Sequence, residues 1–312
     1  MTAEATTVRG PLNADELGRT LVHEHLAVNM MRELRAPGLL NDGVQALAEL
    51  KRFREHGGRT VVDLTNRSLG QHPLALRRFS EQSGVNIILG TGLYRQAYFD
   101  RDQLDRTSTR ALADLFVRDL TDGIDETGVR AGIIGEIGTE VQMTAQEERV
   151  FRAAALAHLE TGTTISTHAA HWPVGLDQLD LLESCGVAPR SVIIGHCDSV
   201  GSPEWTRVAD ITDYHAAIAA RGAYVAFDHI RRGADLQRRV EYIMAMVDSG
   251  RIHQILLSHD AAFRPDLTSN GGDGLTLIFT GLVPRLIERG LSDADIDTIL
   301  VENPRRALTG ME

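Results

Sequence analysis

Short apolar runs, many of them rich in β-branched residues, recur along the chain and alternate with longer segments of helical periodicity. Eight such runs occur, at residues 19–25, 60–65, 85–91, 132–138, 163–168, 191–196, 223–228 and 254–260. Most of them are apolar almost to their last residues, as strands buried on both faces of a parallel sheet are. Between them lie segments that we expect to be helical, including 44–56, 110–126, 146–160 and 236–248.

Eight strands that alternate with helices are the pattern of an α/β fold, the (β/α)8 TIM barrel. A doubly wound open sheet has a similar pattern and is the alternative. The chain has 312 residues and contains no long Pro/Gly/Ser linker or low-complexity tract. Because barrels of this kind often reach such a length as one unit, we expect residues 1–312 to form a single barrel domain.

Composition and charge narrow the class of protein. The hydrophobic fraction of 43% and the charged fraction of 24% are ordinary for a globular enzyme, and the net charge of −11 argues against nucleic-acid binding. The two cysteines, Cys185 and Cys197, form no CxxC pair, which disfavours a disulfide-stapled secreted domain. We find neither a signal-peptide pattern nor a run of ~20 apolar residues. We therefore expect a cytoplasmic protein that does not bind membranes.

The ends of the predicted strands carry the residues with the most chemistry. Five of them contribute His23, His25, Glu136, His168, His196 and Asp260. Strand alternation places His23 and His25 on one face and Glu24 on the other. A lone His-x-His is a weak signal, but six such residues at the ends where barrel active sites lie make chance a poorer explanation. Four imidazoles and two carboxylates suit zinc, manganese or similar ions.

Several segments resemble one known family, and they keep that family's order from about residue 8 to residue 310. These segments are TVRGPLNADELGRTLVHEHL, AGIIGEIGTE, STHAA, VIIGHCD, FDHI, ILLSHDAAF and VENPRRALTG. They resemble the phosphotriesterase-like branch of the amidohydrolase superfamily, and within it the phosphotriesterase-related (homology) proteins. The resemblance implies a binuclear metal centre, with two divalent ions (zinc first, manganese or cobalt as alternatives), and a homodimer.

The same resemblance assigns the ligands. It implies that His23, His25 and Asp260 hold the buried ion, that His168 and His196 hold the outer ion, and that Glu136 bridges the two. Many relatives use a carbamylated lysine as the bridge. Here the only lysine is Lys51, in the predicted helix 44–56. Since Lys51 cannot plausibly reach the fourth strand end, we expect an unmodified Glu136 to bridge.

Two further residues match catalytic positions of the family. His229, in FDHI, corresponds to a histidine that relays protons away from the metal-bound aspartate, here Asp260; a solvent-facing loop histidine is the alternative. The position of the carboxylate that completes this relay in the family is Ser199 here, with Asp198 adjacent, so the sequence departs from the family pattern at this point. Tyr94 corresponds to an aromatic residue at the lactonase substrate pocket, and a packed rim tyrosine is the alternative.

These residues predict metal-assisted hydrolysis of a small-molecule substrate. Two ions ~3.5–4 Å apart would share a bridging hydroxide that attacks the substrate, while Asp260 accepts its proton and Tyr94 hydrogen-bonds the substrate. No GxSxG elbow or Walker A loop is present. We expect a lactonase or esterase. The alternatives are an amide hydrolase of small N-acyl compounds, a phosphotriesterase, a non-catalytic metal-binding barrel, and a mononuclear deaminase, which Glu136 disfavours.

Overall fold

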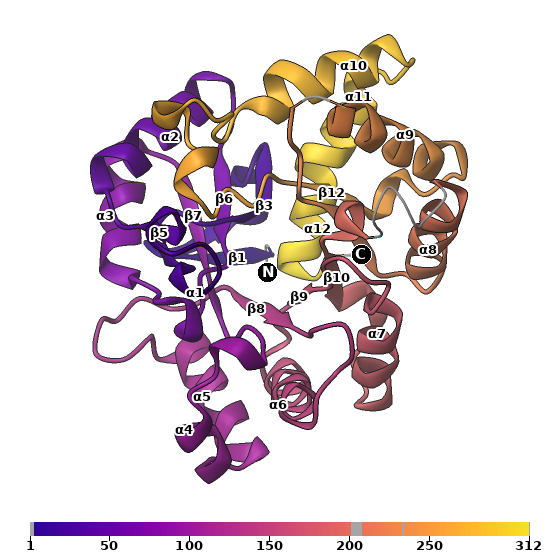
Figure 1. The fold of residues 1–312 in the computed structure, drawn as a ribbon. Coiled ribbons are helices and arrows are strands. Elements are labelled where there is room, and N and C mark those ends of the chain that lie inside the picture. The colour runs from indigo at the N-terminus through magenta and orange to yellow at the C-terminus, as the bar shows by residue number, and fades with distance from the viewer. Residues whose placement is uncertain (1–2, 201–207, 233, 312) are drawn as a thin grey trace.

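The computed structural model describes residues 3–200, 208–232 and 234–311, and its centre is a parallel sheet of eight strands (Figure 1). The strands lie in the order β12-β11-β10-β9-β8-β7-β6-β3, so neighbours in the sheet follow one another along the chain. Their bounds are β3 (Thr20–Glu24), β6 (Thr60–Asp63), β7 (Asn86–Thr91), β8 (Ile133–Gly138), β9 (Ile165–His168), β10 (Val192–Gly195), β11 (Tyr224–Phe227) and β12 (Ile255–Leu257).

The two strands at the ends of this order also meet. Strand β12 contacts β3, the Asp260 backbone N–H donates to the His23 carbonyl at 3.1 Å, and the His23 N–H donates to Ser258 Oγ at 2.9 Å. The sheet is therefore nearly closed into a barrel. The predicted (β/α)8 barrel is confirmed and the open sheet is wrong, because a doubly wound sheet reverses its strand order.

Helices surround the strands on the outside of the barrel (Figure 1). The principal ones are α2 (Gly43–Glu55), α3 (Pro73–Ser83), α5 (Thr109–Thr121), α6 (Ala145–Thr161), α7 (Gly175–Ser184), α8 (Val208–Ala220) and α9 (Ala234–Asp248). All four predicted helices are present, and α6 begins with a capping box between Thr144 and Glu147. Helix α5 ends five residues early, because the chain turns at Gly123, whose φ is +118°. No described helix is long and apolar enough to cross a membrane.

Alternate strand residues divide between two apolar layers. Leu21 and Val61 pack outward against the helices, whereas their neighbours Val22 and Val62 pack inside the barrel. The N-terminal end of the barrel is covered by the hairpin of β1 (Glu4–Thr7) and β2 (Gly10–Asn13) and by α12 (Asn303–Thr309). Apolar side chains from both cover elements join the inner layer. The polar residues of the interior are thereby left to the opposite, C-terminal end.

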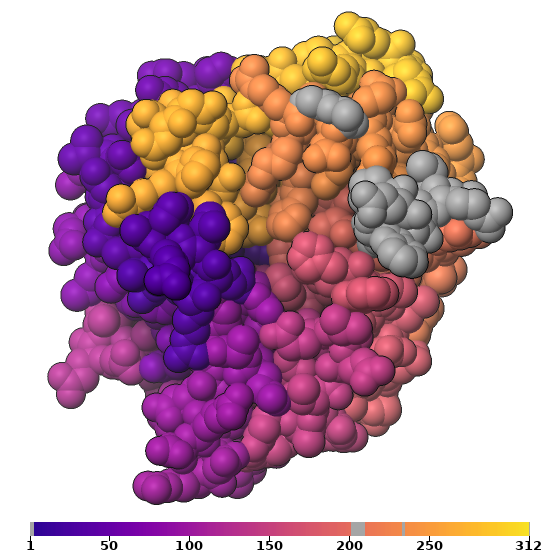
Figure 2. Space-filling model, in the orientation of Figure 1, coloured from indigo at the N-terminus to yellow at the C-terminus, as the bar shows by residue number. Residues whose placement is uncertain are grey.

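At that C-terminal end, loops from the first and last parts of the chain lie side by side. The short strand β5 (Leu39–Leu40) and the segment Arg264–Asp266 meet where Arg264 Nε donates to the Leu39 carbonyl at 3.0 Å. Figure 2 shows these two regions as adjoining indigo and orange-yellow surfaces. The rim of the barrel is thus built from segments more than 200 residues apart.

Candidate metal centre

The structure brings all six predicted ligand residues together at the C-terminal end of the barrel. Their nitrogen and oxygen atoms form three overlapping groups, each within 4.8 Å, that could hold a metal ion. These groups are His23 with His25 and Glu136, His23 with His196 and Asp260, and Glu136 with His168 and His196. His23, Glu136 and His196 each occur in two of them. The three groups therefore overlap, so that all six residues belong to one cluster.

Glu136 lies at the centre of this cluster. Its Oε1 is 3.6 Å from His25 Nε2, and its Oε2 is 3.6 Å from His23 Nε2. The same Oε2 is 3.0 Å from His168 Nδ1 and 3.4 Å from His196 Nε2. One carboxylate thus faces all four imidazoles of the cluster.

Two imidazole nitrogens in the cluster are buried without a hydrogen-bond partner among the described residues: His23 Nε2 and His196 Nε2. Each ring has its other nitrogen, Nδ1, 2.9 Å from an oxygen of Asp228, at the end of β11. Because a carboxylate accepts from Nδ1–H, Asp228 turns both Nε2 lone pairs towards Glu136. A buried lone pair that lacks a donor is costly unless a cation satisfies it. The residues present therefore fit divalent metal ions with nitrogen and oxygen ligands.

His25 is oriented from the neighbouring strand. Its Nδ1 is 2.9 Å from Thr65 Oγ1. The Asp63 carboxylate joins the backbone after β6 to the backbone after β3. It accepts from the backbone N–H groups of Thr65 at 2.9 Å and Leu26 at 2.8 Å. Burial raises the pKa of Asp63. The end of β6 therefore supplies the support for a ligand carried by β3.

Glu24, between the two histidines, turns away from the cluster as strand alternation predicts. It is fully buried and accepts four hydrogen bonds from the segment that follows β12. The donors are Ser258 Oγ at 2.9 Å, His259 N at 2.8 Å, His259 Nδ1 at 2.9 Å and Ala261 N at 3.0 Å. Glu24 thus fastens the first strand to the last at the point that carries Asp260.

The surrounding imidazoles keep the buried Glu136 carboxylate ionised. Burial acts to raise the pKa of Glu136, but the charge of His23 and the hydrogen bond from His168 hold it well below its ordinary value. Burial and the charge of His196 lower the pKa of His168 to about 4. Burial also opposes protonation of His196, yet Asp228 raises its pKa to about 10. The carboxylates that favour a proton on His196 favour a metal cation there equally.

Two of the candidate ligands have a left-handed backbone, His196 with φ +57° and Asp260 with φ +51°. Residues with a Cβ rarely adopt this region, so the surrounding structure must hold them. The His196 N–H donates to Asp228 Oδ1 at 2.9 Å. The Asp260 carbonyl accepts from Arg231 Nη2 at 2.9 Å. Local strain at these strand ends is therefore offset by side chains that aim the ligands inward.

His229 contacts Asp260, with its Nε2 2.7 Å from Asp260 Oδ2. Its side chain is 27% exposed, so it joins the cluster to the cavity above. Asp198 instead accepts the backbone N–H of His229, at 3.1 Å, and pairs with Arg239 Nε at 2.9 Å. Ser199 Oγ donates to the His196 carbonyl at 2.9 Å. Both side chains thus support loop backbone in these contacts rather than the His229 ring.

Tyr94 lies beside the outer part of the cluster. Its hydroxyl is 3.2 Å from His168 Nδ1 and 3.3 Å from His168 Nε2, and its ring stands edge-on to the imidazole at 4.7 Å. Burial, with the charge of Glu136, raises the pKa of Tyr94 well above its ordinary value. The tyrosine is only 3% exposed, so it is a packed residue that also lines the cavity.

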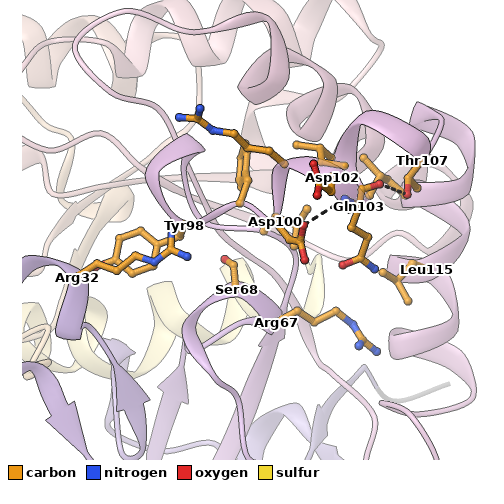
Figure 3. Close-up of a pocket in the computed structure, with 14 residues that line it drawn as sticks. Arg32, Arg67, Ser68, Tyr98, Asp100, Asp102, Gln103, Thr107 and Leu115 are labelled. Carbon is orange, nitrogen blue, oxygen red and sulfur yellow. Dashed lines mark hydrogen bonds between the residues drawn. The ribbon is translucent and has the colours of Figure 1, made fainter.

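A cavity of about 330 Å³ opens above the cluster. It is lined by four of the six candidate ligands, His25, Glu136, His168 and Asp260, and by Tyr94 and His229. A larger cavity, of about 720 Å³, lies beyond Tyr98. Figure 3 shows Arg32 against Tyr98 on one side of it and Asp100 and Asp102 on the other. Its Arg67 is already paired with Asp119, at 2.6 and 2.8 Å. None of the metal-ligand candidates is among its described lining residues, so the smaller cavity is the candidate active site.

Sequence reasoning did not identify the supporting residues Asp228, Glu24 and Thr65. Asp228 had a usable signal, because it is a carboxylate at a strand end, directly before His229 in FDHI. Glu24 and Thr65 carried no such signal in the sequence, because their partners belong to other strands and the segments that follow them. These three residues decide how the candidate ligands point.

The model of the phosphotriesterase family matches residues 3–308. The chain is 36% identical over 297 residues to the phosphotriesterase homology protein of Escherichia coli (strain K12), which covers 94% of this chain and 98% of that protein. It is 28% identical over 367 residues to an N-acetyltaurine hydrolase of Dictyostelium discoideum, with 97% of both chains covered. The crystal structure of a lactonase from Listeria monocytogenes superposes with a TM-score of 0.90 at 26% identity, covering 99% of this chain and 100% of that one.

Proposed function

The chain belongs to the phosphotriesterase family of hydrolases, and from this premise we propose that it hydrolyses carboxylic esters, lactones first among them, at a binuclear metal centre. The observation that carries the metal dependence is the pair of buried nitrogens, His23 Nε2 and His196 Nε2, that have no described partner and face Glu136. The similarity to a lactonase over the whole chain supports the ester class.

We assign the ligands by position in the cluster. His23, His25 and Asp260 would hold the inner ion, His168 and His196 would hold the outer ion, and Glu136 would serve both. The distances of 3.0–3.6 Å from Glu136 to the four imidazoles support this assignment. Bound there, divalent ions supply Lewis acidity and lower the pKa of water towards neutrality.

The protein's own groups move the proton and orient the substrate. Asp260 directs Oδ1 to His25 Nε2, at 3.1 Å, and Oδ2 to His229 Nε2, at 2.7 Å. A proton accepted at Oδ2 can therefore pass to His229, whose partly exposed ring releases it to solvent. Tyr94 stays protonated, and its hydroxyl can donate to a substrate oxygen beside His168.

An amide hydrolase of small N-acyl compounds is the second candidate. It is supported by the similarity to N-acetyltaurine hydrolases along nearly the full chain. The same cluster would serve either reaction, because both pass through a tetrahedral centre with a developing oxyanion. Phosphotriester hydrolysis is proposed as a side activity only.

A hydrolysis screen separates these candidates. Lactones, aryl esters, N-acyl amines and phosphotriesters are tested on zinc- and manganese-loaded protein, and kcat/KM is compared between classes. We expect the highest value for a lactone or aryl ester, and loss of that activity in a His168→Asn/His196→Asn variant. His253→Asn, an exposed histidine, is the matched control. The highest value for an N-acyl amine would transfer the assignment to amides, and no turnover of any class would contradict both.

Metal stoichiometry and assembly are measured on the same preparation. We propose two ions per chain, zinc first with manganese or cobalt as alternatives, and a homodimer. Elemental analysis should find close to two ions in the wild type and about one when His168 and His196 are both replaced. One ion with full activity contradicts the binuclear centre. Sedimentation at several concentrations tests the dimer.

A further inference from the structure

Three charged residues from different segments of the chain meet at the mouth of the candidate active-site cavity. Glu33 belongs to α1 (Met31–Leu34), Arg95 follows β7, and Glu140 follows β8. Arg95 Nη1 is 2.7 Å from Glu140 Oε1, and Arg95 Nη2 pairs with Glu33. Among the described residues that line the cavity, Arg95 is the only lysine or arginine.

The guanidinium of Arg95 is already paired within the protein. Both of its terminal nitrogens are engaged by carboxylates. Its guanidinium lies over the Tyr94 ring at 5.1 Å and near the Tyr98 ring at 5.7 Å. Its Nε is buried, without a partner among the described residues, and so does not face the open cavity. The side chain as a whole is only 18% exposed. Arg95, the only lysine or arginine among the described lining residues, is therefore engaged in ion pairs within the protein.

The accessible part of the mouth is acidic and apolar. Two carboxylates against one guanidinium leave a net negative charge, and the Glu33 and Glu140 side chains are 33% and 40% exposed. Next to them lie Val141 and Trp172, which are 53% and 51% exposed and line the same cavity. Burial lowers the pKa of His171, a further lining residue, so it adds no cation near neutral pH.

We propose that Glu33 and Glu140, by occupying Arg95, make the site selective for substrates whose distal part is uncharged and exclude those that carry a carboxylate or sulfonate there. An anionic group at the mouth would meet two carboxylates as its nearest charged neighbours and would have to displace one of them to reach Arg95. Like charges placed together reject the wrong ligand even when its shape fits. N-acetyltaurine, which carries a sulfonate, would then be a poor substrate here. This inference rests on the proposed ester hydrolysis and specifies its substrate class.

A matched pair of esters tests the proposal: 4-nitrophenyl hexanoate and mono-4-nitrophenyl adipate. The two have the same leaving group and a six-carbon acyl chain, and they differ only in the distal carboxylate. We expect the wild-type kcat/KM to favour hexanoate by at least about tenfold, since like-charge contacts carry penalties of that size or more. Turnover of neither ester would overturn the proposed function, and this inference with it. Turnover of both without a preference would overturn the inference alone.

Variants of the three charged residues shift this ratio in opposite directions. Glu33→Gln/Glu140→Gln frees Arg95 and should lower the hexanoate preference about tenfold, whereas Arg95→Gln should raise it. The matched control is Glu148→Gln/Glu160→Gln on α6, which removes the same charge from two exposed glutamates that also pair with arginines, Arg152 at 2.7 Å and Arg110 at 3.1 Å. The control should change the ratio by less than about twofold, because exposed ion pairs contribute little.

Ionic strength provides a readout that needs no variant. Salt screens charges at an exposed mouth, so NaCl should raise the wild-type kcat/KM for the adipate ester relative to hexanoate. If salt instead lowers the kcat/KM for the adipate ester relative to hexanoate, Arg95 binds the anion and the proposal is overturned. The same conclusion follows if the wild type prefers the adipate ester and Arg95→Gln abolishes that preference. An unchanged ratio in the folded, metal-loaded Glu33→Gln/Glu140→Gln variant would also overturn it. If that variant does not fold, the salt response of the wild type decides.

Discussion

The inner and outer halves of the candidate centre differ in how their ligands are held. On the inner side, His23 is oriented by the Asp228 carboxylate and His25 by Thr65, both at 2.9 Å. The segment that carries Asp260 is fastened to β3 by the four hydrogen bonds of Glu24. On the outer side, the hydrogen-bonding contacts of the His168 ring are the Tyr94 hydroxyl and Glu136 itself.

This difference indicates that the two halves are preorganised to different degrees. Asp228, Thr65 and Glu24 orient the inner ligands before any ion binds, and such support strengthens metal affinity. Among the histidines His168 is the most exposed, with 12% of its side chain accessible against 1% for His23, His25 and His196. Its main support is a tyrosine from a loop. We therefore expect the inner ion to bind more tightly and the outer ion to exchange. Asp228 joins the halves, because it also orients His196.

Glu136→Gln should have the largest effect, because it removes the carboxylate that both halves share. We expect loss of at least one ion and of most activity, measured by elemental analysis and kcat/KM. Reconstitution of the wild type should not depend on bicarbonate, since the sole lysine, Lys51, is exposed on α2 and far from β8 in the barrel. Glu136→Lys should not recover fully even with bicarbonate. Two ions and normal turnover in Glu136→Gln, or a bicarbonate requirement in the wild type, would contradict this account.

Asp228→Asn should weaken both halves together. An amide still accepts one hydrogen bond, but it cannot hold the rings of His23 and His196 with the same charge-assisted contacts. We expect metal affinity to fall about 10–100-fold, as for other residues that orient metal-bound histidines. Titration against a chelator measures this, with Asp180→Asn, an exposed aspartate paired to Arg221, as the control. Affinity equal to the wild type would remove Asp228 from its assigned role.

Glu24→Gln should disturb the inner half alone. It replaces an acceptor of four hydrogen bonds with an amide that places an NH2 group against N–H donors, so the free energy of unfolding should fall by about 1–3 kcal/mol. In cobalt-loaded protein, the visible absorption of the tightly bound (inner) ion should change, whereas that of the exchangeable (outer) ion should not. A change confined to the exchangeable site would reverse our assignment of the halves.

Tyr94→Phe should have the smallest effect and act on the outer half. Because its hydroxyl already contacts His168, we expect kcat to fall by about tenfold, less than the 10²–10³ typical of a dedicated oxyanion donor, with KM nearly unchanged. Steady-state kinetics on the best ester measures both constants, and Tyr98→Phe, whose hydroxyl has no partner among the described residues, is the control. An unchanged kcat would make Tyr94 a packing residue only.

Local pattern predicted the strands well but not their ends. The predicted strand 254–260 corresponds to β12 (Ile255–Leu257), because Ser258 and His259 leave the sheet to bind Glu24. Simple alternation also fails near His23. Its neighbour Val22 already faces the barrel interior, and an irregular register between Leu21 and Glu24 lets adjacent residues face the same side. The barrel was predictable because burial on both faces leaves a strong apolar signal.

The sequence by itself determined the family, the barrel and which residue types stand at the strand ends, since each of these is written in local motifs and periodicity. Their roles as metal ligands stay predictions. Only the tertiary structure decided which side chains aim them. Asp228 meets His23 across 205 positions and Glu24 meets Ser258 across 234. Closure of the barrel brings the first strands of the chain close to the last ones, and this places such partners together. No local sequence pattern encodes these contacts.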